Sequence, residues 1–280
     1  MSRGLLICTD LDRTLIPNGP QQESPGARAC FKRLCDSDEV VLAYVSGRDH
    51  NLVKKAIVDY ALPQPDYVVG DVGTTLYRLD TSDGWSHLSD WEPNISRDWN
   101  GKSHRELRTL FADIRELRLQ ESGKQNRYKL SYYVALYHDH DLLLERMLRR
   151  LDTQGVKSSL VWSVDEQAGV GLLDVVPERA TKYHAIEFLR QTLGYRVAEV
   201  LFSGDSGNDL DVLASPIPAV LVANARQEVR NQAQRLARER AMQDVLYLAK
   251  GGFMGMNGNY SAGILEGLAH YHPSFERVLT

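Results

Sequence analysis

Short blocks of apolar residues alternate with amphipathic segments along the first eighty or so residues of the chain. Compact apolar runs bounded by turn residues or charges predict buried strands, and the longer segments between them carry apolar residues at helical spacing. The predicted strands are 5–9, 40–45, 67–69 and 74–79, and the predicted helices are 25–35 and 51–60. Strands that alternate with helices predict a parallel sheet with helices on both faces, which is a Rossmann-like, doubly wound α/β core.

The same alternation returns in the last third of the chain. The expected elements there are helix 181–193, strand 197–202, helix 208–214, strand 219–222, helix 227–240 and a closing helix 262–270. The region between has irregular spacing, with expected helices 103–119 and 141–151 and expected strands 128–137, 156–162 and 169–176. We therefore expect residues 1–79 and 178–280 to form one core domain and residues 80–177 to be an inserted α+β domain.

The expected insertion holds all four tryptophans and a group of tyrosines. They are Trp85, Trp91, Trp99, Trp162, Tyr128, Tyr132, Tyr133 and Tyr137. Stacked aromatic rings suit the faces of sugars, but the core of a small domain explains most of these rings equally well, and we favour packing for the majority.

Two carboxylates stand where the first predicted strand leaves the core. Asp10 and Asp12 are two positions apart, so in an extended segment their side chains point the same way. Like charges held so close repel each other, and one of the two would bind a proton unless a cation joins them. The pair therefore indicates metal-assisted chemistry, with a strand followed by an Asp-rich turn as the alternative.

Composition narrows the classes of protein without changing this picture. The 280 residues carry a net charge of −4, with 43% hydrophobic and 25% charged residues, which is ordinary for a globular chain. A pI near 6.1 argues against nucleic acid as the main partner, and the densest basic stretch, 226–240, is interleaved with acids as on a solvated helix face. No apolar run is long enough to span a membrane, and acids interrupt the first apolar segment too early for a signal peptide.

The cysteines Cys8, Cys30 and Cys35 form neither a disulfide framework nor a metal-site spacing. Cys8 lies in the first predicted strand, so we expect it to be a small buried side chain. Reduced cysteines fit a reducing compartment, and we expect a cytoplasmic protein that binds neither nucleic acid nor membrane.

Two further segments place phosphate-binding chemistry near the predicted strand ends. Ser46, Gly47 and Arg48 follow the second strand, where a short hydroxyl beside a glycine can hold a phosphate oxygen. Lys182 stands in the first turn of a predicted helix, where its charge opposes the helix dipole. That placement makes sense if the ammonium has to reach a phosphate or an anionic nucleophile.

A glycine-spaced acidic loop, 203–209, links an apolar strand to a helix. Asp205 and Asp209 are four residues apart and can approach one cation, while Asn208 offers an amide. A plain helix capped by Ser206 is the alternative. Ligands of open α/β sheets bind beyond the carboxyl ends of the strands, and all of these segments are predicted to lie at such ends or at adjacent helix starts.

Taken in order, these segments resemble the four motifs of the haloacid dehalogenase-like (HAD) phosphohydrolases. The motif residues are Asp10-Leu11-Asp12-Arg13-Thr14, Ser46-Gly47-Arg48, Lys182 and Gly204-Asp205-Ser206-Gly207-Asn208-Asp209. The insertion resembles a type C2 (C2B) cap domain, and nearly the whole chain is similar to the sucrose-6-phosphate and mannosylfructose-phosphate phosphatases. The segments that carry this closer resemblance are 65–67, 72–74, 128–132, 174–177 and 262–270.

The resemblance implies a Mg²⁺-dependent phosphatase that hydrolyses a disaccharide phosphate, sucrose 6-phosphate first of all, through a phospho-aspartyl intermediate. It makes Asp10 the nucleophile and Asp12 the general acid and base, with Ser46 and Lys182 as catalytic residues that bind phosphoryl oxygens. The implied metal ligands are Asp10, Asp12 through its backbone carbonyl, Asp205, and Asp209 through water. The implied substrate contacts are Ser46, Gly47, Arg48, Gly73, Thr74, Lys129, Lys182 and Asn208.

The roles of several residues stay open. The family usually carries Gly or Asn where this chain has Arg13, whose side chain could touch the phosphate or turn to solvent. Lys129 could equally be a solvent-facing strand residue. His138 and His140 flank Asp139, but a polar loop explains them better than a metal site.

The substrate class also has alternatives. A mannosylfructose-phosphate or glucosylglycerol-type phosphatase would use the same chemistry, and a sugar phosphomutase would transfer the phosphoryl group to a sugar instead of water. From another class, the chain could be a non-catalytic accessory domain of a sugar-phosphate synthase. Such a synthase is also a conceivable partner of an active phosphatase.

Overall fold

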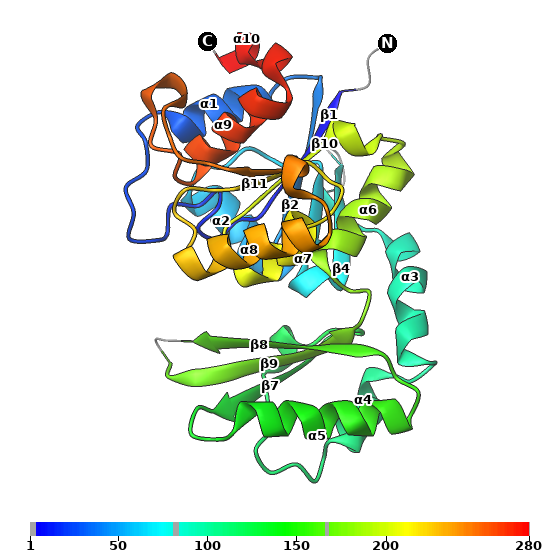
Figure 1. Cartoon of the computed structure of the whole chain (residues 1–280). Coiled ribbons are helices and arrows are strands. Elements are labelled where there is room, and N and C mark those ends of the chain that lie inside the picture. Colours follow the sequence, from blue (N-terminus) through cyan, green and yellow to red (C-terminus); the bar gives the residue numbers. More distant parts are fainter. Residues whose placement is uncertain (1–3, 81–83, 166–167, 280) are drawn as a thin grey trace. The chain divides into compact units, whose positions relative to one another are not determined.

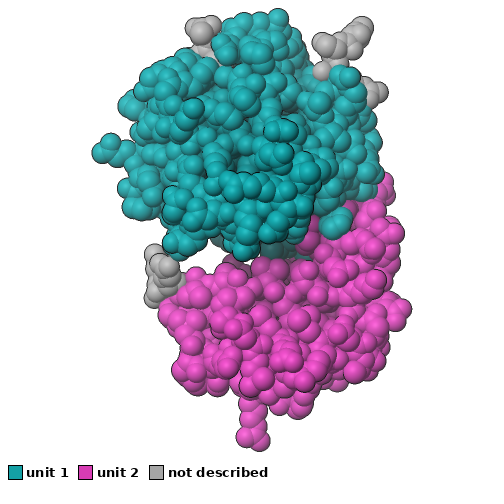
Figure 2. All heavy atoms as spheres, in the orientation of Figure 1, with its two compact units in different colours: residues 1–87, 182–280 teal, residues 88–181 magenta. Residues whose placement is uncertain are grey.

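The computed structural model describes residues 4–80, 84–165 and 168–279. They divide into two compact units, one formed by residues 1–87 and 182–280 and the other by residues 88–181 (Figures 1 and 2). We call these the core unit and the inserted unit.

Within the described residues, an eight-stranded sheet organises the core unit, in the order β12-β11-β10-β1-β2-β3-β4-β5. The strands from β12 to β3 run parallel, and β4 and β5 add an antiparallel edge. Their bounds are β1 (Leu5–Thr9), β2 (Val40–Val45), β3 (Tyr67–Gly70), β4 (Thr75–Asp80), β5 (Gly84–His87), β10 (Val200–Gly204), β11 (Ala219–Leu221) and β12 (Leu246–Leu248). This is the predicted doubly wound α/β sheet.

Helices cover both faces of this sheet (Figure 1). Helices α1 (Ala27–Cys35), α2 (His50–Asp59) and α9 (Ser261–Tyr271) share one apolar cluster with alternate residues of the central strands, among them Leu5 and Ile7. The other helices are α6 (Lys182–Leu193), α7 (Leu210–Leu213), α8 (Gln227–Glu239) and the short α10 (Glu276–Leu279). The chain moves from β1 towards β3 in one direction and from β10 towards β12 in the other, so right-handed crossovers place α7 and α8 on the face opposite α1 and α2.

The reversal of direction falls between β1 and β10. Thr9 lies opposite Ser203 in the parallel register, and the Asp10 N–H donates to the Ser203 carbonyl at 2.9 Å. In an open α/β sheet this switch point leaves a crevice beyond the carboxyl ends of the two strands. The residues that follow β1 and β10 are therefore held side by side.

The inserted unit is an α+β unit with an antiparallel sheet of order β6-β7-β9-β8 in its described residues. Its strands are β6 (Arg118–Leu119), β7 (Leu130–Ala135), β8 (Ser158–Asp165) and β9 (Val170–Pro177), and its helices are α3 (Glu92–Ser96), α4 (His104–Leu110) and α5 (His140–Thr153). Helix α4 packs on β7 and α5 packs on β8.

The helix predicted over residues 103–119 is wrong in its second half. Helix α4 begins with a capping box between Ser103 and Glu106 and already ends at Leu110. Beyond it, the side chains of Phe111 and Ile114 are buried in non-helical chain, and Arg118–Leu119 pairs with β7. Tertiary packing and strand pairing override the helical periodicity of this segment.

The boundaries between the two units differ from the expected ones. They fall at 87/88 and 181/182, not at 79/80 and 177/178. Strand β5 pairs with β4, so Trp85 belongs to the core unit and not, as expected, to the insertion. At the other end, the Arg179 N–H and guanidinium both donate to the buried carboxylate of Asp98, which keeps residues up to 181 with the inserted unit. Trp91 and Trp99 are almost fully buried, as favoured for core packing.

Glycine permits the close approach of α9 to the sheet. A Cβ at Gly267 would lie 2.1 Å from a methyl carbon of Val220 in β11, far inside van der Waals contact. We therefore expect Gly267→Ala to lower the free energy of unfolding by about 1–3 kcal/mol, the usual cost of overpacking a core. Urea denaturation measures it, with Gly123→Ala as control, because no atom lies within 4 Å of that Cβ. Equal midpoints for the two variants would contradict this packing.

Candidate active site

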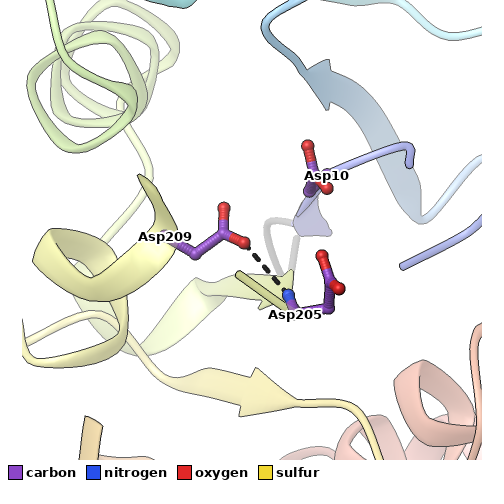
Figure 3. Close-up of side chains that lie close together, drawn as sticks. All are labelled: Asp10, Asp205 and Asp209. Atoms are coloured by element: carbon purple, nitrogen blue, oxygen red, sulfur yellow. Dashed lines mark hydrogen bonds between the residues drawn. The ribbon is translucent and has the colours of Figure 1, made fainter. Parts of the chain in front are cut away.

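Three carboxylates that are far apart in the sequence meet at the switch point (Figure 3). Asp10 follows β1, Asp205 follows β10, and Asp209 ends the single 3₁₀ turn η6 (Gly207–Asp209). All three are buried, and one oxygen from each lies within 4.8 Å of the others. Among the described residues this is the group of acidic, histidine or cysteine side chains that could hold a metal ion.

Lys182 neutralises part of this charge. Its side chain is 4% exposed and its ammonium donates to Asp10 Oδ1 at 2.8 Å and to Asp209 Oδ1 at 2.7 Å. Lys182 is the first residue of α6, so the helix start aims the side chain at the strand ends. The expectation that this lysine reaches an anion is met by two carboxylates.

Asp209 is the most constrained of the three acids. Its Oδ2 accepts hydrogen bonds from the backbone N–H groups of Asp205 and Ser206, each at 3.0 Å, and from the Ser206 hydroxyl. A Cβ at Gly204 would lie 2.5–2.7 Å from the Asp209 side chain, so only glycine admits this approach. Capping by Ser206, which was the alternative to a cation site, is present as well, because Ser206 forms a capping box with Asp209 and so helps to hold an acid of the site.

Thr14 links the two remaining acids. Its hydroxyl lies 3.3 Å from Asp10 Oδ2 and 3.5 Å from Asp205 Oδ1. The resemblance places this threonine in the first motif, but we did not predict it as a site residue from the sequence. Its place in the HAD-like motif was the signal that could have identified it.

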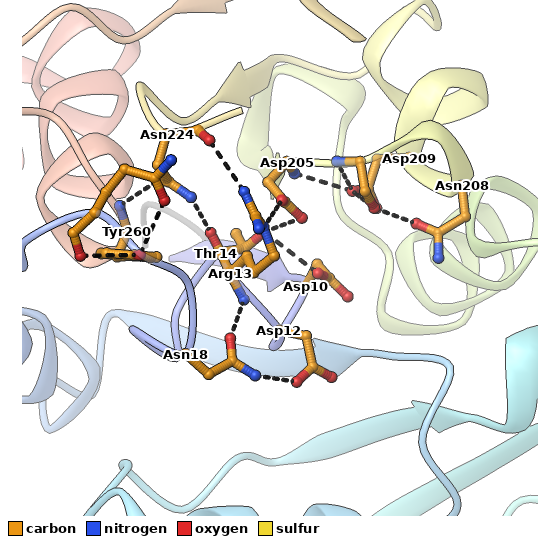
Figure 4. Close-up of polar contacts among 12 residues, drawn as sticks. Asp10, Asp12, Arg13, Thr14, Asn18, Asp205, Asn208, Asp209, Asn224 and Tyr260 are labelled. Carbon is orange, nitrogen blue, oxygen red and sulfur yellow. Dashed lines mark hydrogen bonds and ion pairs between the residues drawn. The ribbon is translucent and has the colours of Figure 1, made fainter. Parts of the chain in front are cut away.

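Arg13 was expected to touch the phosphate or to turn to solvent. Its side chain does not turn to solvent but pairs with an acid of the site, and contact with the phosphate stays a prediction. Its Nε donates to Asp205 Oδ2 at 3.1 Å, and its Nη2 lies 3.4 Å from the Asn224 carbonyl oxygen (Figure 4). Its backbone has φ 58°, in the left-handed region that favours Gly and Asn. This conformation gives a physical reason for the residue types usual at this position.

Asp12 has a different environment from Asp10. Arg48 donates to both of its carboxylate oxygens, at 2.6 and 2.8 Å, and Asn18 donates to Oδ1 at 2.7 Å. Burial raises the pKa of Asp12, but the hydrogen bonds and charge of Arg48 lower it more, and the net shift is downward. Arg48, predicted as a substrate contact, is thus paired with the predicted acid and base.

Burial has the opposite net effect on Asp10. It raises the pKa of Asp10 to about 7; Lys182 lowers this pKa, and the charges of Asp209 and Asp205 raise it. Burial likewise raises the pKa of Asp205 to about 6, with a contribution from Asp209 and opposition from Arg13. The pKa of Lys182 is lowered by burial but raised more strongly by Asp10 and Asp209, so the ammonium stays charged. Three carboxylates facing two cations leave an excess of negative charge, which a divalent metal would neutralise.

Several of the other predicted residues lie at the same end of the sheet. Ser46 follows β2 and is buried, and its hydroxyl accepts a hydrogen bond from the Arg48 N–H at 3.2 Å. Gly47 is exposed, and no atom lies within 4 Å of a Cβ placed there. The turn η1 (Asp71–Gly73), which leads into Thr74, packs against α6 and is bonded to the Arg48 carbonyl through Asp71 N–H.

Two predicted substrate contacts have distinct settings. Asn208 is exposed on η6, where its side-chain oxygen accepts from the Ser206 hydroxyl at 2.9 Å. Lys129 belongs to the inserted unit, just before β7, and is only 6% exposed. The solvent-facing alternative for Lys129 is therefore wrong.

The remaining candidates are structural. Asp139 caps α5 by accepting from the Leu142 N–H, as expected for a polar loop at 138–140.

In the part of the chain that the structure describes, no helix combines the length and apolarity needed to cross a membrane.

Comparison with known proteins decides the family. A family model of sucrose-6F-phosphate phosphohydrolases matches residues 3–272. The chain belongs to this family. It is a HAD-like phosphatase that acts on phosphoric monoesters, and the predicted resemblance and fold class are confirmed.

Individual relatives agree with this assignment. A protein of Nitrosococcus oceani named as a HAD-like hydrolase is 53% identical over 274 residues, which are 98% of this chain and 73% of that protein. The mannosylfructose-phosphate phosphatase of Agrobacterium fabrum is 27% identical over 95% of this chain and 96% of its own length. The sucrose-phosphatase of Synechocystis, solved in complex with sucrose and phosphate, shares the fold with a TM-score of 0.72 at 23% identity, over 96% of this chain and 98% of that one.

In the absence of divalent metal, the stability of this phosphatase should depend on pH. Burial raises the pKa of Asp10 to about 7 and that of Asp205 to about 6, above the ordinary 3.8, so their stabilising contribution is complete below about pH 4 and is lost as the pH rises through 6 and 7. In EDTA the melting temperature should be higher at pH 6 than at pH 8, and Mg²⁺ should raise it most at pH 8. Asp10→Asn should reduce both the pH dependence of the melting temperature and its rise with Mg²⁺. If Mg²⁺ raised the melting temperature of this variant as much as that of the unmodified protein, Asp10 would not be a metal ligand.

Proposed function

We propose that this phosphatase hydrolyses a disaccharide phosphate, sucrose 6-phosphate first of all, through a phospho-aspartyl intermediate on Asp10. The observation that carries the proposal is the buried carboxylate of Asp10, which Lys182 holds at the end of β1 with Asp205 and Asp209 beside it. A carboxylate removed from water and oriented by a fixed cation is suited to attack phosphorus, because little reorganisation is needed.

Two displacements would complete the reaction. An oxygen of Asp10 would form a bond to phosphorus while the bond from phosphorus to the sugar oxygen breaks, and the sugar oxygen would take a proton from Asp12. Water would then attack phosphorus, give a proton to Asp12 and release inorganic phosphate from Asp10. The Asp12 side chain is 41% exposed and can exchange protons with solvent, whereas Asp10 is buried.

Arg48 would couple substrate arrival to the proton transfer. Because Arg48 binds both oxygens of Asp12, a proton can be placed on that carboxyl only when the ion pair opens. An arriving phosphorylated sugar offers the guanidinium another anionic partner. This supports the prediction that Arg48 contacts the substrate.

The oxygen donors of the site fit Mg²⁺, which prefers carboxylate, carbonyl and water ligands. Asp10, Asp205 and the backbone carbonyl of Asp12 would hold it directly and Asp209 through water, which suits an acid whose Oδ2 already holds its own loop. When bound, the ion would neutralise charge on the transferring phosphoryl group. Lys182 and Ser46 would bind phosphoryl oxygens.

The inserted unit would act as the cap that selects the leaving group and excludes water. Lys129 is its predicted sugar contact, and its burial next to β7 gives the ammonium a defined position. From the core unit, Gly47, Gly73, Thr74 and Asn208 are proposed to complete the substrate contacts.

A mannosylfructose phosphate is the second candidate substrate. The Agrobacterium fabrum relative, named for that activity, aligns with nearly the full length of both chains. Transfer to a sugar, as in a phosphomutase, is distinguished by the absence of free phosphate. An association with a sugar-phosphate synthase stays a prediction.

Asp10→Asn should abolish turnover, by at least about a thousandfold, because the amide cannot form the covalent intermediate. Phosphate release from the preferred substrate in excess Mg²⁺ measures the loss. Asp59→Asn, an exposed acid on α2, is the matched control and should retain full activity. A folded Asp10→Asn variant with appreciable phosphatase activity would rule out the nucleophile assignment.

A panel of phosphorylated disaccharides should identify the substrate. We expect the highest kcat/KM for sucrose 6-phosphate, with mannosylfructose phosphate and glucosylglycerol phosphate behind it, and no release in the presence of chelator. A clear preference for one of the other two sugar phosphates would make that compound the proposed substrate and would leave the proposed reaction unchanged. Loss of phosphate from none of them, with Mg²⁺ present, would refute the proposed function.

A further inference from the structure

Arg13 occupies an oxygen of a proposed metal ligand. Its guanidinium lies 3.1 Å from Asp205 Oδ2, and within the described part of the chain this is the ion pair that Asp205 makes (Figure 4). The other close contact of the carboxylate is the Thr14 hydroxyl at 3.5 Å. Asp10 and Asp209, by contrast, share Lys182. The two cations of the site are therefore divided among the three acids.

The backbone of Arg13 is built to hold it in this place. Its N–H donates to Asn18 Oδ1 at 2.8 Å and its carbonyl accepts from Asn224 Nδ2 at 2.6 Å. Asn224 is itself fixed by the Tyr260 N–H, at 2.8 Å. These contacts maintain a left-handed backbone that an arginine adopts only at an energetic cost.

The side chain of Arg13 is more accessible and less tightly held than that of Lys182. It is 27% exposed and its contacts with Asp205 and with the Asn224 carbonyl are 3.1 and 3.4 Å long, whereas the Lys182 side chain is 4% exposed and makes two contacts of 2.7 and 2.8 Å. A cation that arrives at Asp205 can therefore displace the guanidinium towards solvent without opening the core. It cannot displace Lys182 in the same way.

We propose that Arg13 is a resident counter-cation that competes with the divalent metal for Asp205 and so lowers the affinity of the site for Mg²⁺. This inference rests on the metal role in the proposed function. It makes Arg13 a positioning residue that sets the Mg²⁺ concentration at which the site fills. In the metal-free protein it keeps the Asp205 carboxylate compensated, and on binding it has to give up a charged hydrogen bond.

Calorimetric titration with Mg²⁺ alone, in the absence of substrate, tests the proposal. Arg13→Asn removes the charge and suits the left-handed backbone, so it should fold and bind Mg²⁺ about tenfold more tightly, the change expected for loss of one charged hydrogen bond. Arg13→Lys keeps the charge without the guanidinium geometry and should lie between the two. Arg277→Asn, in a surface pair with Glu39, makes the same change in net charge and should leave the affinity unaltered.

The outcomes separate this inference from the proposed function. If Arg13→Asn bound Mg²⁺ as weakly as the unmodified protein, or more weakly, the competition between Arg13 and Mg²⁺ would be overturned. Arg13→Gly tests the same competition if the Asn variant does not fold. If Arg277→Asn tightened binding as much as Arg13→Asn, a general charge effect would replace the competition. Absence of Mg²⁺ binding to the unmodified protein would refute the metal role itself, whatever the variants do.

Discussion

The repulsion among three buried carboxylates is the constraint on which the active site depends. Asp10, Asp205 and Asp209 are brought together where the chain reverses its direction across the sheet, a place that burial makes costly for charge. Lys182 bridges Asp10 and Asp209, and Arg13 pairs with Asp205. The backbone N–H groups at 205 and 206 also donate to Asp209. Two cations of the chain thus face three acids, and the remaining negative charge is what a divalent cation is proposed to neutralise.

The two aspartates of the first motif acquire different properties from their surroundings. Asp10 is buried and its pKa is raised, whereas Asp12 lies in a partly exposed bidentate pair with Arg48 and its pKa is lowered. Two neighbouring carboxyls with pKa values pushed apart are the arrangement expected when one acts as nucleophile and the other transfers protons. In the pairs Arg48–Asp12 and Arg13–Asp205 the arginine is partly exposed, so each guanidinium has room to turn towards solvent when its acid takes up the proposed proton or metal.

Much of the fold could be predicted because the core strands are compact apolar runs. Strands β1 and β2 begin and end at the predicted residues, and α1, α2, α6 and α9 differ from prediction by one or two residues at their ends. The prediction was weaker where local pattern and pairing disagree. The segment after Leu110 has helical periodicity, but its last two residues form β6 by pairing with β7. Strand β5 was missed because only one of its four residues is apolar and it is stabilised mainly by its pairing with β4.

The sequence by itself determined which residues are the candidates for the chemistry and at which strand ends they stand, because acids, glycines and a lysine at those positions have few structural explanations. It did not determine the partners of these residues. That Arg13 binds Asp205 and that Arg48 binds both oxygens of Asp12 are decided by contacts between segments 192 and 36 residues apart. Local pattern reports how a segment folds, whereas the balance of charge in a buried site is set only when distant strands are placed side by side.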